Sequence, residues 1–192
     1  MKLLVLTAPS GAGKTTLARR LMDQVPGLRF SVSATTRAPR AGEEDDVHYH
    51  FLTPAEFSAR LAAGEFLEHE EVYPGRFYGT LRPELEALAA RDDVRAVVLD
   101  IDVKGAVNVK RLYGDAAMTL FVQPPSLAAL AERLHARGTE DAGRIAERLE
   151  RAKMEIGYAG EFDAVVVNDD LETAVAETAA RVRAFLDGPG GV

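Results

Sequence analysis

The chain has 192 residues, a formal net charge of −7 and no cysteine. This length fits one domain, and the acidic balance gives no electrostatic reason to expect a nucleic-acid partner. The lack of cysteine excludes disulfides, thiolate metal ligands and cysteine nucleophiles. Because no run of about 18 apolar residues occurs, we expect no membrane partner and a soluble, cytoplasmic protein. The sequence gives no basis for predicting an oligomeric state.

Four apolar runs along the chain are continuous rather than alternating with polar residues. They cover residues 3–6, 96–99, 118–122 and 164–167. Strands of this kind are buried on both faces, as in a parallel sheet covered by helices. The runs therefore predict an α/β fold.

Helical patterns separate these runs. After the first run, Leu17 and Leu21 fall on one face of a helix. Thr53-Pro54-Ala55-Glu56 is a capping box with proline at the first helical position. Residues 171–185 keep a three-and-four spacing of apolar side chains, and Gly188 follows as a stop signal.

Two polar stretches interrupt the alternation of strands and helices. One runs from Ser33 to about Ala90, and the other, rich in Arg and Glu, runs from Ser126 to about Gly160. We expect both to be inserted lobes over the carboxyl edge of the sheet, where open α/β sheets bind ligands. The prediction is a single domain of residues 1–192, with its core in residues 1–32, 91–125 and 161–192.

The segment after the first apolar run reads Ala8-Pro-Ser-Gly-Ala-Gly-Lys-Thr. It matches the phosphate-binding loop G-x-x-x-x-G-K-[ST], with Ala8 in place of the first glycine. Its glycines let backbone N–H groups surround phosphate oxygens at a helix N-terminus. Lys14 would bind the β- and γ-phosphates, and the Thr15 hydroxyl suits Mg²⁺. The residues expected to contact the triphosphate are Pro9, Ser10, Gly11, Ala12, Gly13, Lys14, Thr15 and Thr16.

The first inserted stretch carries arginines and tyrosines that can hold a second phosphate group. These residues are Arg37, Arg40, Tyr49 and Tyr78. A carboxylate such as Glu68 would meet the N–H donors of guanine, and the hydroxyls of Ser33 and Thr80 would meet its O6 atom. Adenine would leave that carboxylate facing an acceptor. The alternative is that these side chains are ordinary exposed residues of a solvated lobe.

The second inserted stretch places arginines in pairs four residues apart, which lie on one helical face. The pairs are Arg133 with Arg137 and Arg144 with Arg148. Arginines on a mobile element can close on the charge that develops during phosphoryl transfer, and closure expels water. The alternative is a solvated face on which these arginines pair with neighbouring glutamates.

At these residues the chain resembles the guanylate kinase family, whose members move the γ-phosphate of ATP onto GMP. The matching blocks occur in the family's order from about residue 2 to residue 186. They are "APSGAGKTTL", "SVSATTRAPRAGE", "HYHF", "GEFLEH", "FYGT", "LDID", "RLHARGTE" and "VVVNDD". The resemblance implies a P-loop core with a parallel sheet flanked by helices, a GMP-binding lobe in the first inserted stretch and a helical lid in the second.

The resemblance also implies roles for individual residues. Ser33, Glu68 and Thr80 would contact guanine beside Gly79. The GMP phosphate would be held by Arg37, Arg40, Tyr49 and Tyr78. Asp100 or Asp102 would reach the guanine side or order a water on Mg²⁺, and the sequence does not divide these roles. The implied catalytic residues are Lys14, Arg37, Arg137 and Arg148, with Arg148 also on GMP, and the implied ATP contacts outside the loop are Arg133, Arg137, Asn168 and Asp169.

The chain departs from the family pattern at three places. Ala8 replaces a glycine, and Lys104 stands where the family usually has glutamine. The segment "VYPGRFYGT" is one residue longer than usual, so the tip before Tyr78 is expected to differ. Among the histidines, His48 and His50 alternate on an expected strand, and none of the four has metal-ligand spacing.

We conclude that the sequence predicts an enzyme that phosphorylates GMP, and also dGMP, from Mg-ATP in purine nucleotide metabolism. Two alternatives stay open. One is a kinase of another nucleoside monophosphate, against which Glu68 argues. The other is a guanylate-kinase-like domain that binds peptides without catalysis, against which Lys14 and Thr15 argue.

Overall fold

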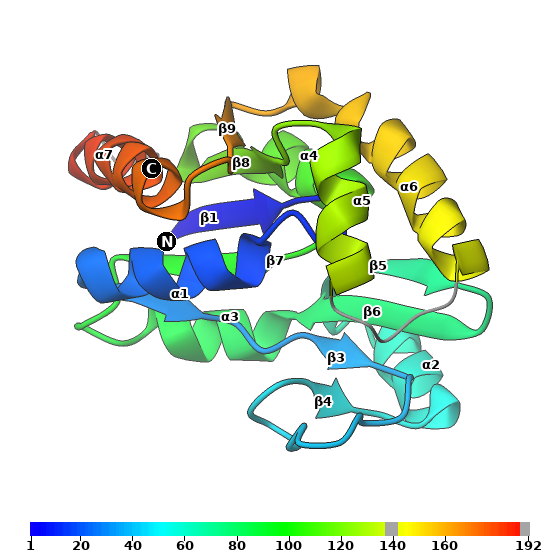
Figure 1. The fold of residues 1–192 in the computed structure, drawn as a ribbon. Helices are drawn as coiled ribbons and strands as arrows, with labels where there is room; N and C mark the ends of the chain where they lie inside the picture. Colours follow the sequence, from blue (N-terminus) through cyan, green and yellow to red (C-terminus); the bar gives the residue numbers. More distant parts are fainter. Residues whose placement is uncertain (137–141, 189–192) are drawn as a thin grey trace.

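The computed structural model describes residues 1–136 and 142–188, and its core is a sheet of five parallel strands (Figure 1). In spatial order they are β2 (Leu28–Phe30), β7 (Ala96–Asp100), β1 (Lys2–Thr7), β8 (Ala117–Gln123) and β9 (Ala164–Val167). The chain leaves β1 toward β2 and β7 on one side and later adds β8 and β9 on the other. The carboxyl end of β1 is therefore the topological switch point of the sheet.

Helices cover both faces of this sheet. Leu4 and Leu6 pack in one buried cluster with residues of α1 (Lys14–Gln24) and α7 (Leu171–Asp187). Leu3 and Val5 pack in another, with residues of α3 (Arg82–Ala89) and α4 (Val103–Tyr113). All four side chains of this run are 0% exposed. The prediction of a parallel sheet buried on both faces is confirmed, and each of these side chains contributes about 2 kcal/mol of burial.

A second, smaller sheet forms the lobe between β2 and β7. Its strands, in order, are β4 (His50–Phe51), β3 (Ala34–Thr35), β6 (Arg76–Leu81) and β5 (Phe66–Tyr73). The helix α2 (Pro54–Ala62) packs on it through Phe57, whose ring stacks on Phe66 with centroids 4.4 Å apart. Thr53 and Glu56 form the predicted capping box at the start of α2.

Two helices, α5 (Leu127–Ala136) and α6 (Ala142–Ile156), stand over the carboxyl edge of the core sheet (Figure 1). They share a small apolar cluster that includes Leu130, Leu134 and Ile145. Two short 3₁₀ turns complete the described elements, η1 (Gly114–Ala116) and η2 (Ala159–Glu161). In the described part of the chain no helix is both long and apolar enough to cross a membrane.

Three features of the predicted lobe can be compared with the structure: the histidine at position 48, the tip before Tyr78 and the helix α3. His48 is not on a strand, because a turn between Asp45 and Tyr49 brings its N–H to the carbonyl of Glu44. The tip before Tyr78 is a tight turn at residues 74–75 between β5 and β6, and its expected difference from the family pattern stays a prediction. The helix α3 belongs to the stretch that was predicted as a lobe, but its Leu85 packs into a cluster of the core sheet. The proposed division into core, lobe and lid therefore stays a prediction.

Candidate active site

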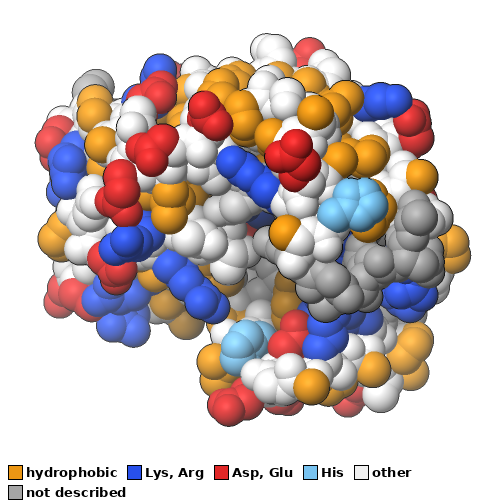
Figure 2. All heavy atoms as spheres, in the orientation of Figure 1, with side chains coloured by type: hydrophobic (Ala, Val, Ile, Leu, Met, Phe, Trp, Pro, Cys, Tyr) orange, Lys and Arg blue, Asp and Glu red, His pale blue; other side chains and the backbone are white. Residues whose placement is uncertain are grey.

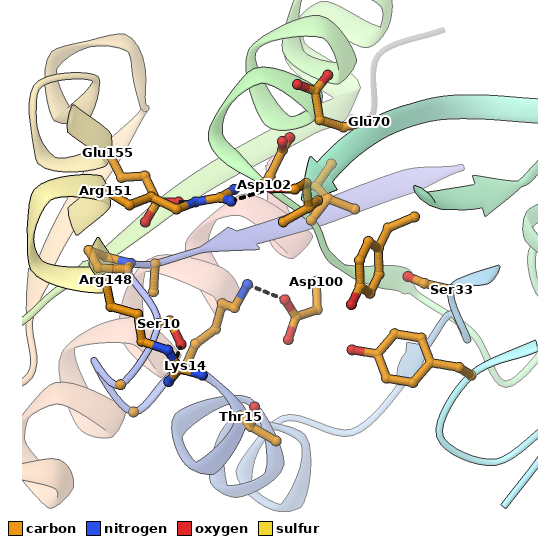
Figure 3. Close-up of a pocket in the computed structure, with 18 of the residues that line it drawn as sticks. Ser10, Lys14, Thr15, Ser33, Glu70, Asp100, Asp102, Arg148, Arg151 and Glu155 are labelled. Carbon is orange, nitrogen blue, oxygen red and sulfur yellow. Dashed lines mark hydrogen bonds and ion pairs between the residues drawn. The ribbon is translucent and has the colours of Figure 1, made fainter. Parts of the chain in front are cut away.

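A cavity of about 690 Å³ lies between the core sheet, the lobe and α6 (Figure 3). It opens at the carboxyl ends of β1 and β7, which is where open α/β sheets bind ligands. Most of the predicted site residues line it. They are Pro9, Ser10, Gly11, Gly13, Lys14, Thr15, Thr16, Ser33, Arg40, Tyr49, Glu68, Tyr78, Gly79, Asp100, Asp102 and Arg148. The face of the molecule seen in Figure 2 is hollowed between core and lobe, and acidic and basic side chains are interspersed over it.

The loop between β1 and α1 forms one end of the cavity. Gly11 and Gly13 have φ values of 96° and 94°, in the left-handed region that favours glycine. Gly13 is the N-cap of α1 and has no side-chain cap, so the first N–H groups of the helix are left for a ligand. A Cβ at Gly11 would lie 2.9 Å from the Leu134 side chain of α5. The loop thus has the backbone shape of an anion site and is covered by α5.

Lys14 and Asp100 form an ion pair across the middle of the cavity (Figure 3). Their side chains are 18% and 25% exposed, and both face the cavity. Thr15, in the first turn of α1, lines the same wall. The pair holds Lys14 in the cavity beside the loop, where a polyphosphate could replace the carboxylate as its partner.

Asp102 has a different setting from Asp100, although both line the cavity. It is the N-cap of α4 and accepts a 2.7 Å hydrogen bond from the N–H of Gly105. Burial raises the pKa of its carboxyl group. A Cβ at Gly105 would lie 2.7 Å from Glu68 Oε2 and 3.0 Å from Asp102 Oδ1, so this aspartate stands beside Glu68. The structure therefore separates the two aspartates: Asp100 faces Lys14, and Asp102 faces the glutamate.

Glu68 of β5 is an acidic side chain with which the lobe lines the cavity. The Thr80 hydroxyl donates a 2.7 Å hydrogen bond to Glu68 Oε1. Burial raises the pKa of the Glu68 carboxyl group to about 7, against the opposing effect of the hydrogen bond from Thr80. Thr80 itself is buried and does not line the cavity, so it orients the carboxylate. Ser33 lines the cavity on the same side (Figure 3).

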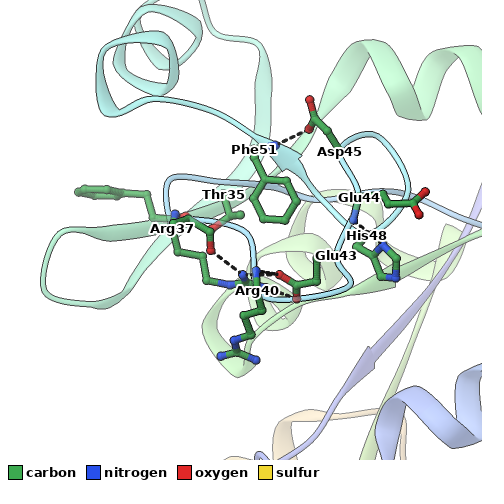
Figure 4. Close-up of polar contacts among 10 residues, drawn as sticks. Thr35, Arg37, Arg40, Glu43, Glu44, Asp45, His48 and Phe51 are labelled. Carbon is green, nitrogen blue, oxygen red and sulfur yellow. Dashed lines mark hydrogen bonds and ion pairs between the residues drawn. The ribbon is translucent and has the colours of Figure 1, made fainter.

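Arg37 does not line the cavity, and Figure 4 shows it beside Glu43. Its guanidinium donates to both carboxylate oxygens of Glu43 at 2.6 and 2.7 Å. It also lies 4.8 Å from the centre of the Tyr49 ring, a cation–π contact. The pair with Arg37 lowers the pKa of Glu43 to about 2. Arg40 extends away from the pair, and its side chain, unlike that of Arg37, lines the cavity.

The helix α6 contributes a stripe of charged side chains to the cavity. Arg148 Nη1 lies 3.4 Å from the hydroxyl of Ser10 in the phosphate loop. Arg144, Arg151 and Glu155 line the cavity on the same face of the helix. The predicted Arg137 lies outside the described residues.

Three of the predicted ATP contacts outside the loop do not line the cavity. Asn168, 5% exposed, donates its side-chain N–H to the carbonyl of Ala12 at 2.7 Å. Arg133 donates to the carbonyl of Asn168 at 2.9 Å and to that of Asp169. Like Ala12, these three residues are not in the described lining. Asn168, which Arg133 holds in turn, thus braces the phosphate loop from the side of β9.

Sequence reasoning missed several residues of the cavity wall. These are Glu70, Val72, Ile101, Arg151 and Glu155. A signal existed for two of them, because Arg144, Arg148, Arg151 and Glu155 follow one another at spacings of four, three and four and so share a helical face. Glu70 lies two residues after Glu68 on β5, which places both on one face of the strand.

The molecule combines a three-layer α/β core, a glycine loop at its switch point and a half-buried lysine beside that loop, which is the arrangement of a P-loop nucleotide-binding protein. The family model described as guanylate kinase matches residues 1–184. The chain is 59% identical to the guanylate kinase of Salinibacter ruber over 184 residues, which cover 96% of each chain. It is 50% identical to that of Chlorobaculum tepidum over 98% of this chain and 95% of the relative.

A solved structure agrees with these sequence relatives. The crystal structure of guanylate kinase from Anaplasma phagocytophilum superposes with a TM-score of 0.79 at 32% identity. The match covers 97% of this chain and 87% of that one. The chain therefore belongs to the guanylate kinase family, as its motifs predicted, and it is an enzyme of that family.

Proposed function

We propose that the protein transfers the γ-phosphate of ATP directly to GMP, or to dGMP, within the cavity described above. Membership of the guanylate kinase family supports this reaction, which yields ADP and GDP. Residues of the phosphate loop and Glu68 both line the cavity, so it offers groups for a polyphosphate and for a base. The peptide-binding alternative lacks support, because the loop, Lys14 and Thr15 are all in place.

The phosphate loop and the start of α1 would hold the triphosphate of ATP. Lys14 would leave Asp100 and bind the β- and γ-phosphates, where its charge offsets the charge that builds up in transfer. In the described part of the chain no group of three acidic or histidine side chains could hold a metal by itself. The donors present, the Thr15 hydroxyl and the nearby Asp100 carboxylate, fit Mg²⁺, which binds proteins through few oxygens and shares phosphate and water ligands. Mg²⁺ would supply charge neutralisation of the phosphates.

The lobe would hold the acceptor nucleotide. The ionised carboxylate of Glu68 accepts hydrogen bonds from the N1–H and N2–H groups of guanine, and Ser33 lies beside it. Tyr49, Tyr78 and Arg40 line the cavity between this glutamate and the phosphate loop, so they suit the phosphate of GMP. Arg37 would support these contacts by fixing the Tyr49 ring and the loop of Glu43.

The lid would complete the site when both substrates are bound. Arg148 reaches the phosphate loop from α6 and would meet the transferred group. No nucleophile of the protein is required, because phosphoryl transfer between nucleotides depends on positioning and charge stabilisation. Closure of α5 and α6 would keep water from accepting the phosphate. We infer that the enzyme works in the cytoplasm, where both nucleotides are found.

The single observation that carries the acceptor assignment is Glu68, which is half-buried beside Asp102 and held by Thr80. The test is release of ADP from Mg-ATP with GMP, dGMP, AMP, CMP or UMP as acceptor. We expect turnover with GMP and dGMP only, because the other bases lack the paired N–H donors of guanine. Equal turnover with AMP would overturn the assignment of a guanine pocket but would still support a nucleotide kinase activity. No turnover with any acceptor would overturn the proposal.

A further inference from the structure

One side chain of the lid joins two parts of the molecule that would hold different substrates. Arg151 of α6 donates from Nη1 to the carbonyl of Val72 in β5 at 2.7 Å. Its Nε donates to Glu155 Oε1, one turn further along α6, at 2.8 Å. The side chains of this pair are only 27% and 9% exposed. Figure 3 shows Arg151 reaching from α6 across the cavity wall toward the lobe.

The acceptor of this hydrogen bond, the carbonyl of Val72, lies at an irregular position of β5. The pairing of β5 with β6 is irregular between Glu71 and Tyr73, so Val72 lies where the ladder is interrupted. Irregularities of this kind bend a strand and leave a residue without its ladder partner, and they are frequent beside active sites. The irregularity makes the Val72 carbonyl an acceptor for a group from outside the sheet.

The positions along each element connect this bond to both halves of the cavity. Val72 lies four residues after Glu68 on the same strand. A movement of β5 would therefore also move the Glu68 carboxylate, which is proposed to bind the guanine base. Arg148 lies three residues before Arg151 on α6 and faces Ser10 of the phosphate loop. One helical turn of α6 therefore touches the donor loop through Arg148 and the acceptor lobe through Arg151.

Glu155 gives the arginine a fixed geometry. It accepts the Nε–H of Arg151, which leaves Nη1 directed at the lobe. Burial raises the pKa of Glu155, while the hydrogen bond and charge of Arg151 and the charge of Lys14 lower it. A second cavity of about 200 Å³ lies behind the pair and shares Val72, Arg151 and Glu155 with the main one. The pair thus lies between the two cavities, and hydrogen bonds within the pair and to Val72 help to hold its geometry.

We propose that Arg151 is a positioning residue that couples closure of α6 over the ATP site to the placement of the GMP-binding strand β5, through its bond to the Val72 carbonyl. The inference rests on the assignment of donor and acceptor sites under the proposed function. Coupling between two sites is reciprocal, so ATP and GMP would tighten each other's binding by the same factor.

The experiment compares Arg151→Met with the native protein. Methionine keeps an unbranched apolar stem and removes both hydrogen bonds. GMP binding is measured by calorimetry with and without the magnesium complex of the β,γ-imido analogue of ATP. We expect the analogue to tighten GMP binding to the native protein by about fivefold or more, and by less than about twofold in the variant. The binding of each ligand alone should change by a smaller factor than the coupling does.

Two further variants make the result specific. Arg181→Met removes a similar pair, since Arg181 bonds Glu177 four residues away on α7, outside the cavity, and it should keep the native coupling factor. Arg151→Lys can make one of the two bonds and should keep part of the coupling, which also serves if Arg151→Met does not fold. Native coupling in folded Arg151→Met, equal loss in Arg181→Met, or no coupling in the native protein would overturn the proposal. Failure of GMP to bind at all, with AMP binding instead, would overturn the proposed acceptor.

Discussion

The side-chain amide of Asn168, at the end of β9, packs against Gly13 and donates a hydrogen bond to the carbonyl of Ala12. A Cβ at Gly13 would clash with this amide, so the glycine serves the packing as well as the turn. Arg133 in turn donates to the carbonyl of Asn168. The phosphate loop is therefore braced from the strand on the far side of β8, through a residue that does not line the cavity.

The first prediction concerns this brace. Asn168→Ala would leave the carbonyl of the fully buried Ala12 without its partner. We expect the free energy of unfolding in urea to fall by about 1–3 kcal/mol. The KM for ATP should rise more than the KM for GMP, because the loop holds the donor. Asn108→Ala, at an exposed position of α4, is the matched control and should change neither quantity. An unaltered KM for ATP in Asn168→Ala would contradict the bracing role.

The second prediction concerns Lys14. Lys14→Met should lower kcat by about 10²–10³-fold, because its charge acts on the transferred phosphate. The free energy of unfolding should change little, since the Asp100 carboxylate left behind is a quarter exposed and can be hydrated. Steady-state kinetics and urea unfolding check the two parts. Lys153→Met removes an exposed lysine paired with Glu150 and should match the native protein. An unchanged kcat in Lys14→Met would show that the lysine does not act in the catalytic step.

The sequence predicts the core of this molecule well, for a physical reason. Buried parallel strands and a phosphate loop are local patterns, in which each residue type follows from its own backbone position. Leu3 to Leu6 therefore lie in β1 as expected, and Gly11 and Gly13 have the positive φ that the loop requires. The capping box at Thr53 is confirmed for the same reason.

The rest of the site depends on contacts between distant segments, which the motifs do not specify. Thr80 was expected to face the base, but pairing of β5 with β6 turns its hydroxyl to Glu68. Arg37 was expected at a phosphate, but the turn before β4 brings Glu43 to its guanidinium. Arg151 was not predicted, because its partner is a backbone carbonyl 79 residues away. The roles assigned to the site residues stay predictions until they are tested.

The third prediction concerns the pH dependence set by Glu68. Its carboxyl pKa is about 7, and only the ionised form can accept both N–H groups of guanine. The kcat/KM for GMP should therefore fall as pH is lowered through 7, to about a tenth of its plateau at pH 6. The phosphate of GMP also titrates near pH 6. The Glu68→Gln variant has no carboxyl group at this position, so its pH profile shows the effect of the phosphate alone. Identical pH profiles for the two proteins would contradict the assignment.

The same pKa predicts a change in stability. The pKa of Glu68 is raised by folding from 4.5 to about 7, so the native state holds this proton more tightly than the unfolded chain. The stability that Glu68 contributes is present below about pH 4.5 and is lost as pH rises through 7. Glu68→Gln should thus gain stability relative to the native protein at pH 8 and show no such gain at pH 4. Urea unfolding at the two pH values tests the sign, and a larger gain at pH 4 would contradict it.

The fourth prediction concerns the pair of Arg37 and Glu43. A double-mutant cycle with Arg37→Met and Glu43→Gln should give an interaction energy of about 1–3 kcal/mol in unfolding, because the contact is bidentate and shielded. The exposed pair of Arg29 and Asp93 should give less than about 1 kcal/mol. The lowered pKa of Glu43 means that its stabilising effect is present above pH 4.5 and is lost only as pH falls toward 2.

The kinetics of these two variants separate two roles for Arg37. If the arginine supports Tyr49 and the loop from behind, Arg37→Met and Glu43→Gln should raise the KM for GMP by similar factors. A far larger rise in Arg37→Met alone would mean that the guanidinium leaves Glu43 and contacts the phosphate of GMP directly. Neither variant should alter the KM for ATP.

The last prediction concerns Lys104, where the chain departs from the family pattern. Its ammonium group donates to Glu70 Oε1 at 2.9 Å, and its side chain is 55% exposed. An ion pair this exposed contributes less than about 1 kcal/mol, and a glutamine amide can still donate to the same oxygen. Lys104→Gln should therefore change kcat/KM for GMP by less than about threefold, as should the exposed control Lys153→Gln. A tenfold loss would show that the lysine charge acts on the acceptor, and the loss should then shrink in 0.5 M salt, at which surface charges are screened within about 4 Å.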